Sequence, residues 1–168
     1  VSPLEIFEYA DKNKTLPKTN AVNEEAFTEH FAKILKDYDA IIHFDISSEM
    51  SSAYANAVNA AKKFENVYVV DSRTLSTAIS LEAIYAKKLT ETMDDPAEIV
   101  KAVEKRIPSV QASFIIERLD YLYKGGRCSG LALLGANLLR IRPEIEVIGG
   151  TMKNTEKFRG KMTDCVTK

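Results

Sequence analysis

Two short apolar runs with a helix-length segment between them constrain the fold of this chain most strongly. Residues 40–46 and 67–70 are apolar runs bounded by polar residues, which is typical of buried strands. Over residues 52–64, apolar side chains recur at helical spacing. A strand, a helix and a second strand in succession indicate a right-handed βαβ unit with a parallel sheet. The predicted fold class is therefore α/β.

Helix-start signals place further helices around this unit. Ser2 is a predicted N-cap, followed by Pro3 at the first helical position and Glu5 at the third, and Asn23 is a second predicted cap. The predicted helices cover residues 3–11, 24–37, 52–64, 77–92 and 95–106. The pattern changes after Pro108.

Beyond Pro108 the predicted elements are shorter. We expect strands over residues 110–116 and 145–148, and helices over 119–124, 131–139 and from 157 onward. The sequence therefore predicts a parallel α/β domain over residues 1–108 and part of a second α/β domain over residues 109–168.

Charge and composition exclude several classes of protein. A formal net charge of −1 gives no overall attraction to nucleic acid or to an anionic membrane. No apolar stretch approaches the roughly 20 residues that span a bilayer. Cys128 and Cys165 lack metal-ligand spacing and indicate a reducing compartment. The first residues do not resemble a signal peptide, so we expect a cytoplasmic protein, with no metal and no cofactor.

Hydroxyl groups gather where the first predicted strand meets the next helix. Ser47, Ser48, Ser51 and Ser52 occupy this turn. The first N–H groups of a helix lack intrahelical partners and attract anions. In parallel sheets, ligands bind beyond the carboxyl ends of the strands, where a second hydroxyl-rich loop, residues 72–77, is also expected. The turn is a candidate site for a carboxylate or a phosphate.

Simpler roles exist for the same residues. Serine before a helix most often serves as a cap, and Ser72 suits a turn at the end of a strand. His43, inside a predicted strand, is expected to be a core histidine rather than a base.

Six motifs, in order along nearly the whole chain, resemble those of the DegV family. Residues 46–54 read Ile-Ser-Ser-Glu-Met-Ser-Ser-Ala-Tyr, similar to the family's Ile-Ser-Ser-x-Leu-Ser-Gly-Thr-Tyr. Residues 119–127 match Leu-x-x-Leu-x-x-Gly-Gly-Arg. The other four motifs lie at residues 17–19, 70–73, 134–143 and 157–160.

This resemblance implies two α/β domains with a long-chain fatty acid buried between them. Such proteins resemble the lipid-binding subunit of bacterial fatty acid kinase, which performs no catalysis itself. That subunit presents the carboxylate to a separate kinase subunit, which makes an acyl-phosphate for phospholipid synthesis.

The resemblance also assigns roles to single residues. It places the ligand carboxylate on Thr19 and Ser51, with Ser52 as a further donor. Arg159 becomes a candidate contact to the kinase or to the transferred phosphate. Further candidate ligand contacts are Ser47, Ser48, Ser72 and Arg127.

The chain departs from the family pattern in places. The family's Ser-Gly-Thr reads Ser51-Ser52-Ala53, and its Thr-Ser-Gln-Pro reads Thr19-Asn20-Ala21-Val22. The family's opening strand and a later segment with a histidine have no counterpart here. We therefore expect a fragment that lacks both ends of a longer protein.

Two other functions remain open. The Ser47–Ser52 cluster could supply the nucleophile of a hydrolase or phosphotransferase, although this needs a base oriented by an acid. The sequence contains neither a Gly-x-Ser-x-Gly motif nor a P-loop. A domain that binds no ligand and serves only protein contact is the third possibility.

Overall fold

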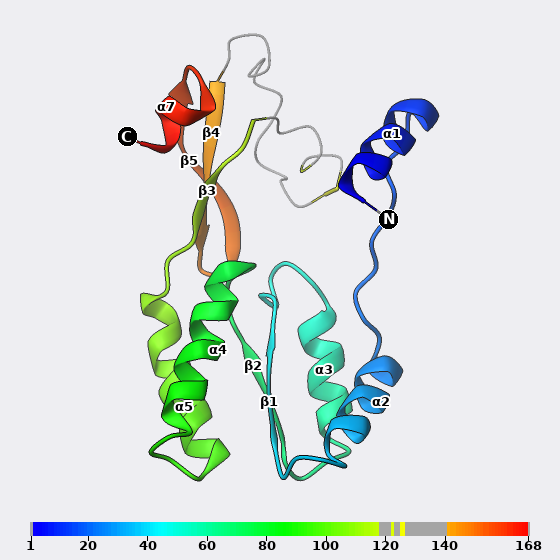
Figure 1. The fold of residues 1–168 in the computed structure, drawn as a ribbon, viewed down its shortest axis with the longest axis vertical. Helices are drawn as coiled ribbons and strands as arrows, with labels where there is room; N and C mark the ends of the chain where they lie inside the picture. The colour runs from blue at the N-terminus through cyan, green and yellow to red at the C-terminus, as the bar shows by residue number, and fades with distance from the viewer. Residues whose placement is uncertain (1, 118–121, 123–124, 127–140, 168) are drawn as a thin grey trace. The chain divides into compact units, whose positions relative to one another are not determined.

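Along the first two-thirds of the chain, one helix separates two strands and further helices flank them on both sides (Figure 1), as the sequence predicts. The computed structural model describes residues 2–117, 122, 125–126 and 141–167. The predicted helix over 131–139, most of the one over 119–124, and Arg127 lie outside these residues. The elements up to residue 106 are α1 (Pro3–Asn13), α2 (Glu24–Ile34), β1 (Ile41–Asp45), α3 (Ala53–Ala61), β2 (Val67–Asp71), α4 (Thr77–Leu89) and α5 (Pro96–Arg106).

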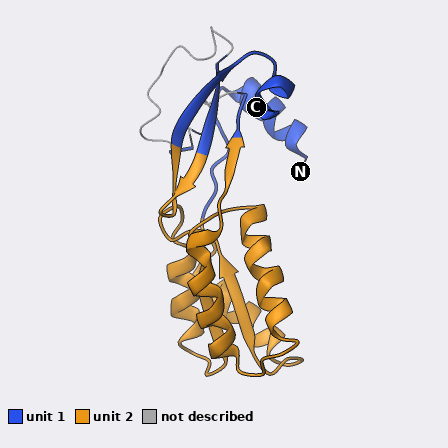
Figure 2. Ribbon diagram, turned by 90° about the vertical axis from the view of Figure 1, so that its left-hand side faces the viewer, with its two compact units in different colours: residues 1–20, 115–145, 154–168 blue, residues 21–114, 146–153 orange. Residues whose placement is uncertain are grey.

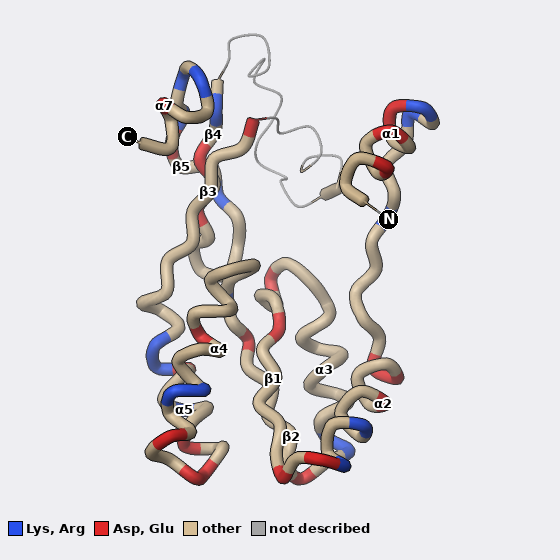
Figure 3. The backbone as a smooth tube through the Cα atoms, viewed as in Figure 1, with Lys and Arg blue, Asp and Glu red and all other residues tan. Residues whose placement is uncertain are grey.

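Local capping fixes where several helices begin. Ser2 and Glu5 form a capping box at α1, in which each side chain bonds the other's backbone N–H. The side chain of Asn23 accepts a hydrogen bond from Ala26 N–H at the start of α2, and that of Asp95 accepts one from Ala97 N–H at the start of α5. Acidic and basic residues are interspersed along α2 and α5 (Figure 3).

Strands β1 and β2 pair in parallel, which confirms the predicted fold class. The register runs from Ile41 opposite Val67 to Asp45 opposite Asp71. The carboxyl ends of both strands therefore lie side by side, and the loops that follow them start from the same edge of the sheet.

Each face of this sheet carries its own apolar core. Phe27 and Phe31 of α2 pack with Ala57 and Ala60 of α3 against one face. Ala86 of α4 packs with Ile99 and Val103 of α5 against Val70 on the other face. Small alanines on α3 let the helix approach the strands closely, and the sheet is buried between two helical layers.

A second sheet follows the short 3-10 helix η1 (Ile107–Ser109). It has the order β3 (Ser113–Ile115), β4 (Ile141–Ile148) and β5 (Thr151–Arg159), and α7 (Met162–Val166) follows it. Gly149 and Gly150 join β4 to β5 with φ angles of +60° and +84°. Positive φ at both positions is what a two-residue type I′ hairpin turn requires.

This hairpin corrects part of the sequence prediction. A helix beginning near residue 157 is wrong, because residues 157–159 belong to β5 and the helix begins at Met162. The Gly-Gly turn sends the chain back beside β4, and strand pairing overrides the local pattern. The strand expected over 145–148 already begins at Ile141, and the one expected over 110–116 covers only Ser113–Ile115.

The chain forms two compact units (Figure 2). Unit 1 comprises residues 1–20, 115–145 and 154–168, and unit 2 comprises residues 21–114 and 146–153. The tip of the β4–β5 hairpin thus belongs to the same unit as the βαβ sheet. A domain boundary near Pro108 stays a prediction.

Candidate functional site

The turn between β1 and α3 holds the four predicted serines, and Ser47 is its buried anchor. The Ser47 hydroxyl donates a hydrogen bond to the Gly150 carbonyl, at 2.7 Å, and accepts one from Glu49 N–H, at 3.3 Å. Its side chain has no exposed surface. Ser47 therefore joins the turn to the β4–β5 hairpin, and both of its hydrogen bonds stay inside the protein.

Asp71, at the end of β2, holds Ser48. Its Oδ1 accepts hydrogen bonds from Ser48 N–H (3.1 Å) and Arg73 N–H (3.0 Å), and its Oδ2 accepts one from the Ser48 hydroxyl (2.5 Å). Three hydrogen bonds from two residues therefore converge on this one carboxylate. Asp71 thus shapes the serine turn from the neighbouring strand.

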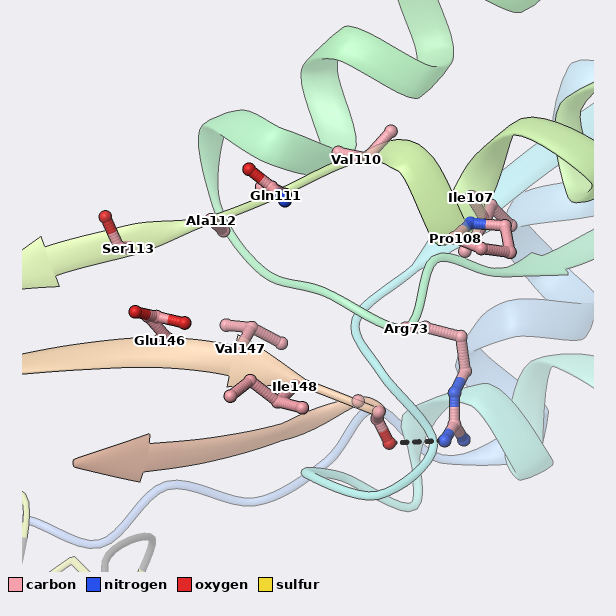
Figure 4. Close-up of a pocket in the computed structure, with 12 residues that line it drawn as sticks. Arg73, Ile107, Pro108, Val110, Gln111, Ala112, Ser113, Glu146, Val147 and Ile148 are labelled. Atoms are coloured by element: carbon pink, nitrogen blue, oxygen red, sulfur yellow. Dashed lines mark hydrogen bonds between the residues drawn. The ribbon is translucent and has the colours of Figure 1, made fainter. Parts of the chain in front are cut away.

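Arg73 binds the serine turn and the hairpin at the same time. Its Nη1 donates to Ser48 Oγ and Glu49 Oε1, each at 3.2 Å, and its Nη2 donates to the Gly149 carbonyl. Figure 4 shows the guanidinium pointing toward that carbonyl. Nη1 also lies 3.6 Å from Asp71 Oδ2. Arg73 itself has φ +53°, an uncommon conformation for a non-glycine residue.

Ser51 and Ser52 stand at the start of α3. The Ser51 Oγ accepts a hydrogen bond from Ala53 N–H at 3.1 Å, so its own O–H remains available as a donor. Ser52 is exposed and makes no side-chain cap bond. Among the described residues, no hydrogen bond uses the N–H groups of Tyr54 or Ala55. This first turn therefore presents hydroxyl and N–H donors together, an arrangement that suits an anion.

The second hydroxyl-rich loop, residues 72–77, is tied to the same sheet edge. Ser47 N–H donates to the Thr74 carbonyl at 3.0 Å, and Ser72 N–H donates to the Asp45 carbonyl at 3.3 Å. The Ser72 side chain is 1% exposed, and its hydroxyl donates to the Thr74 carbonyl. Ser47, Ser48 and Ser72 thus have structural partners, while Ser51 and Ser52 offer donors.

Thr19 and Arg159 belong to unit 1, and both are exposed. Three residues after Thr19, the Val22 carbonyl accepts a hydrogen bond from the Asn56 side chain of α3 at 2.7 Å. The backbone that follows Thr19 is therefore fastened to α3. A joint site of Thr19 with Ser51 stays a prediction.

His43 is only partly buried, with 24% of its side chain exposed, and it packs beside the phenylalanines of the core. Its ring lies edge-on to Phe27 and Phe31, with centroids 5.3 and 5.4 Å away. Its Nε2 is 3.5 Å from Asp45 Oδ2. Within the described part of the chain, no serine hydroxyl is hydrogen-bonded to His43, so the Ser–His pair that a serine nucleophile needs is not formed there.

A pocket of about 880 Å³ lies beside the hairpin, on the side of Arg73 (Figure 4). Glu146 and Arg73 supply its charged groups. Most of the rest of its lining is apolar or backbone, from Ile107, Pro108, Val110, Ala112, Val147 and Ile148. Neither Thr19, Ser51 nor Ser52 lines this pocket, so it is distinct from the predicted carboxylate site.

The sequence prediction missed Glu82, which is 1% exposed on the inner face of α4. Neither carboxyl oxygen has a hydrogen-bond partner among the described residues. Burial, and secondarily the charge of Asp71, raises the pKa of Glu82 to about 7. The signal in the sequence was the helical spacing: Ala78 and Ala86 lie four residues before and after Glu82, on the same face of α4. Both alanines are buried in the structure.

Two kinds of site are not seen in the described residues. Those residues contain no cluster of three or more His, Cys, Asp or Glu side chains that could hold a metal ion. Their helices are all too short or too polar to cross a membrane.

Comparisons with known proteins agree on one family. The family model described as "Uncharacterised protein, DegV family" matches residues 1–164. A DegV domain-containing protein of Clostridium acetobutylicum is 34% identical over 164 residues, covering 93% of this chain and 59% of the relative. A fatty acid-binding protein of Thermotoga maritima is 34% identical over 150 residues, covering 87% of this chain and 52% of the relative.

Solved structures give the same result. A DegV lipid-binding protein of Thermotoga maritima superimposes with a TM-score of 0.78 at 31% identity, covering 95% of this chain and 57% of that one. A fatty-acid-binding DegV family protein of Thermus thermophilus gives 0.81 at 26% identity, with the same coverage. This chain thus spans less than two-thirds of the length of these relatives. Together with the six ordered motifs and the parallel βαβ sheet, these matches show that the chain belongs to the DegV family.

Proposed function

We propose that this chain takes part in binding a long-chain fatty acid, whose carboxylate is held at the first turn of α3. The observation that carries the proposal is the set of donors there: the Ser51 O–H, the Ser52 hydroxyl and the N–H groups of Tyr54 and Ala55. Two relatives that are named for lipid or fatty acid binding support the choice of ligand.

The physical chemistry of the ligand fits neutral donors. A buried carboxylate without partners is very costly, whereas each hydrogen bond to a charged group contributes about 1.5–3 kcal/mol. The acyl chain supplies most of the affinity, at about 0.8 kcal/mol per buried CH₂ group. Thr19 would add a further hydroxyl, because the chain leads from it to Val22, which is bonded to α3.

We propose a carrier role rather than catalysis for the same residues. The serine turn has donors for an anion, but the described residues pair none of its hydroxyls with a histidine base. In this proposal a separate kinase subunit converts the presented carboxylate to an acyl-phosphate, in the cytoplasm. Arg159, exposed on β5, is the proposed contact to that kinase or to its phosphate.

Native mass spectrometry of the full-length protein, purified without added lipid, tests the ligand. We expect a mass increase that matches long-chain fatty acids and disappears after solvent extraction and refolding. A protein that carries no acyl chain, and that binds none when fatty acid is added back, would refute the proposal.

Kinase contact needs its own experiment. Arg159→Ala, with Lys157→Ala as the neighbouring exposed control on β5, should lower kinase-dependent acyl-phosphate formation while fatty acid binding stays unchanged. Equal turnover of the Arg159 variant and the wild type would remove Arg159 from this role.

A further inference from the structure

A buried carboxyl group, Glu82, belongs to α4, whose apolar core lies on the face of the sheet opposite that of α3. Glu82 belongs to the face of α4 that also carries Ala78 and Ala86, and Ala86 packs against Val70 of β2. Neither Glu82 oxygen has a hydrogen-bond partner among the described residues. A buried ionised carboxylate without partners is costly, and nothing in the proposed ligand site accounts for an acid at this position.

The position of Glu82 connects it to the proposed anion site. Helix α4 starts at the edge of the sheet where β1 and β2 end, and from which the serine turn also departs (Figure 1). Ser72 and Thr74, which lead into α4, are also buried polar residues, and Thr74 Oγ1 is unpaired within the described residues. Asp71 is linked to both: it accepts hydrogen bonds from Ser48 of the turn, and its charge helps raise the pKa of Glu82.

Asp71 and Glu82 differ in what stabilises their charge. Asp71 accepts three hydrogen bonds, and its Oδ2 lies 3.6 Å from Nη1 of Arg73. Neither oxygen of Glu82 accepts a hydrogen bond within the described part of the chain. Burial, and secondarily the charge of Asp71, raises the pKa of Glu82 to about 7, so the charge of Glu82 changes near neutral pH.

The other titratable groups nearby are accounted for. On β1, His43 and Asp45 face each other at 3.5 Å. On α3, burial and then Asp71 raise the pKa of the Tyr54 hydroxyl, which keeps it neutral. Helix α5 packs against α4, and its charged residues are Glu98, Lys101, Glu104, Lys105 and Arg106. Asp71 is the one charged group that contributes to the raised pKa of Glu82.

We propose that an anion bound at the first turn of α3 and a proton bound by Glu82 favour each other. The inference rests on the proposed function, since it assumes that the turn binds an anion. A bound carboxylate would add a second negative charge beside Asp71, and an ionised Glu82 would be repelled by both. A neutral Glu82 is not repelled.

The sign of the pH dependence follows from linkage. Binding the anion raises the pKa of Glu82 further. The affinity for the anion is therefore highest below the pKa of Glu82 in the free protein. It falls as the pH rises through that value, and it levels off above the higher pKa of the complex.

A ligand that does not titrate isolates the protein's own proton. Dodecanesulfonate stays ionised, so its binding to the full-length protein can be followed from pH 5.5 to pH 8.5 below its micelle concentration. We expect the wild type to lose roughly three- to tenfold in affinity across this range. Glu82→Gln should bind with a flat profile, at the affinity that the wild type has at pH 5.5. The control Glu91→Gln, at an exposed position after α4, should keep the wild-type profile.

Proton uptake by the wild type gives a second measurement that needs no variant. Calorimetry of sulfonate binding at pH 7 in two buffers with different ionisation enthalpies should show uptake of a fraction of one proton per anion bound. A flat wild-type profile, a profile that persists in Glu82→Gln, or zero proton uptake would overturn the coupling while leaving the anion site intact. Absence of sulfonate and fatty acid binding at every pH would instead refute the proposed function.

Discussion

The Ser47 hydroxyl donates to the carbonyl oxygen of Gly150 at 2.7 Å, although the two residues are 103 positions apart in the sequence. This bond, together with that from Arg73 to the Gly149 carbonyl, fixes the tip of the β4–β5 hairpin beside the serine turn. In both bonds the acceptor is a backbone carbonyl of the two-glycine turn. The shape of the serine turn therefore depends on a hairpin from the far end of the chain.

Gly150→Ala should destabilise the protein more than Gly149→Ala. A Cβ at Gly150 would lie 2.6 Å from Ser47 Oγ and 2.8 Å from Arg73 Cζ, whereas a Cβ at Gly149 meets nothing within 4 Å. Both positions have positive φ, which costs about 1–2 kcal/mol for alanine. Overpacking adds roughly 1–3 kcal/mol at Gly150 alone. Urea unfolding of both variants checks this, and equal losses would contradict the close contact.

Asp71→Asn should loosen the serine turn and lower the pKa of Glu82. The substitution removes the charge that accepts hydrogen bonds from Ser48 and Arg73 and that raises the pKa of Glu82. NMR titration of the Glu82 carboxyl carbon measures the second effect directly. A Glu82 pKa that stays at its wild-type value in this variant would show that the two carboxyl groups are not coupled.

Glu82→Gln should change the pH dependence of stability. The Glu82 pKa rises from 4.5 to about 7 on folding, so the folded state binds the proton more tightly than the unfolded state. The stability from this group is fully present below pH 4.5 and is lost as the pH rises toward 7. The wild type should therefore lose about 2–3 kcal/mol between pH 5 and pH 8 from this source.

Denaturant unfolding of wild type and Glu82→Gln at the two pH values isolates this contribution. The glutamine variant has no such loss, so its stability relative to the wild type should be higher at pH 8 than at pH 5. A difference between the two proteins that is independent of pH would mean that Glu82 does not titrate in this range.

Local sequence signals predicted the βαβ part of the fold well. The cap Asn23 and the apolar runs of β1 and β2 act over a few residues, so they could be recognised in the sequence. Strand β5 could not be recognised in this way. Its residues form a strand because the Gly149–Gly150 turn brings them beside β4. A charged residue is expected at the surface, so residue type did not predict that Glu82 is buried. Only its place between two alanines on one helix face pointed to burial.

The candidate site was predictable in part for the same reason. A strand, a serine-rich turn and a helix start lie within fifteen residues, so the donors at Ser51 and Ser52 could be located from sequence. The roles of Asp71 and Arg73 depend on the register of β1 against β2 and on the distant hairpin. These contacts join segments that no local pattern relates, which is why the sequence did not reveal them.

The central claim, that the first turn of α3 holds a fatty acid carboxylate, is tested most directly by comparing hexadecanoic acid with hexadecanol. Binding of both to the full-length protein should be measured for the wild type, for Ser51→Ala/Ser52→Ala, and for Ser80→Ala as an exposed control on α4. We predict that the wild type and the control prefer the acid, and that the double variant loses roughly tenfold or more of this preference, since each lost hydrogen bond to a charged group costs about 1.5–3 kcal/mol. An unchanged preference for the acid in the double variant would contradict the account.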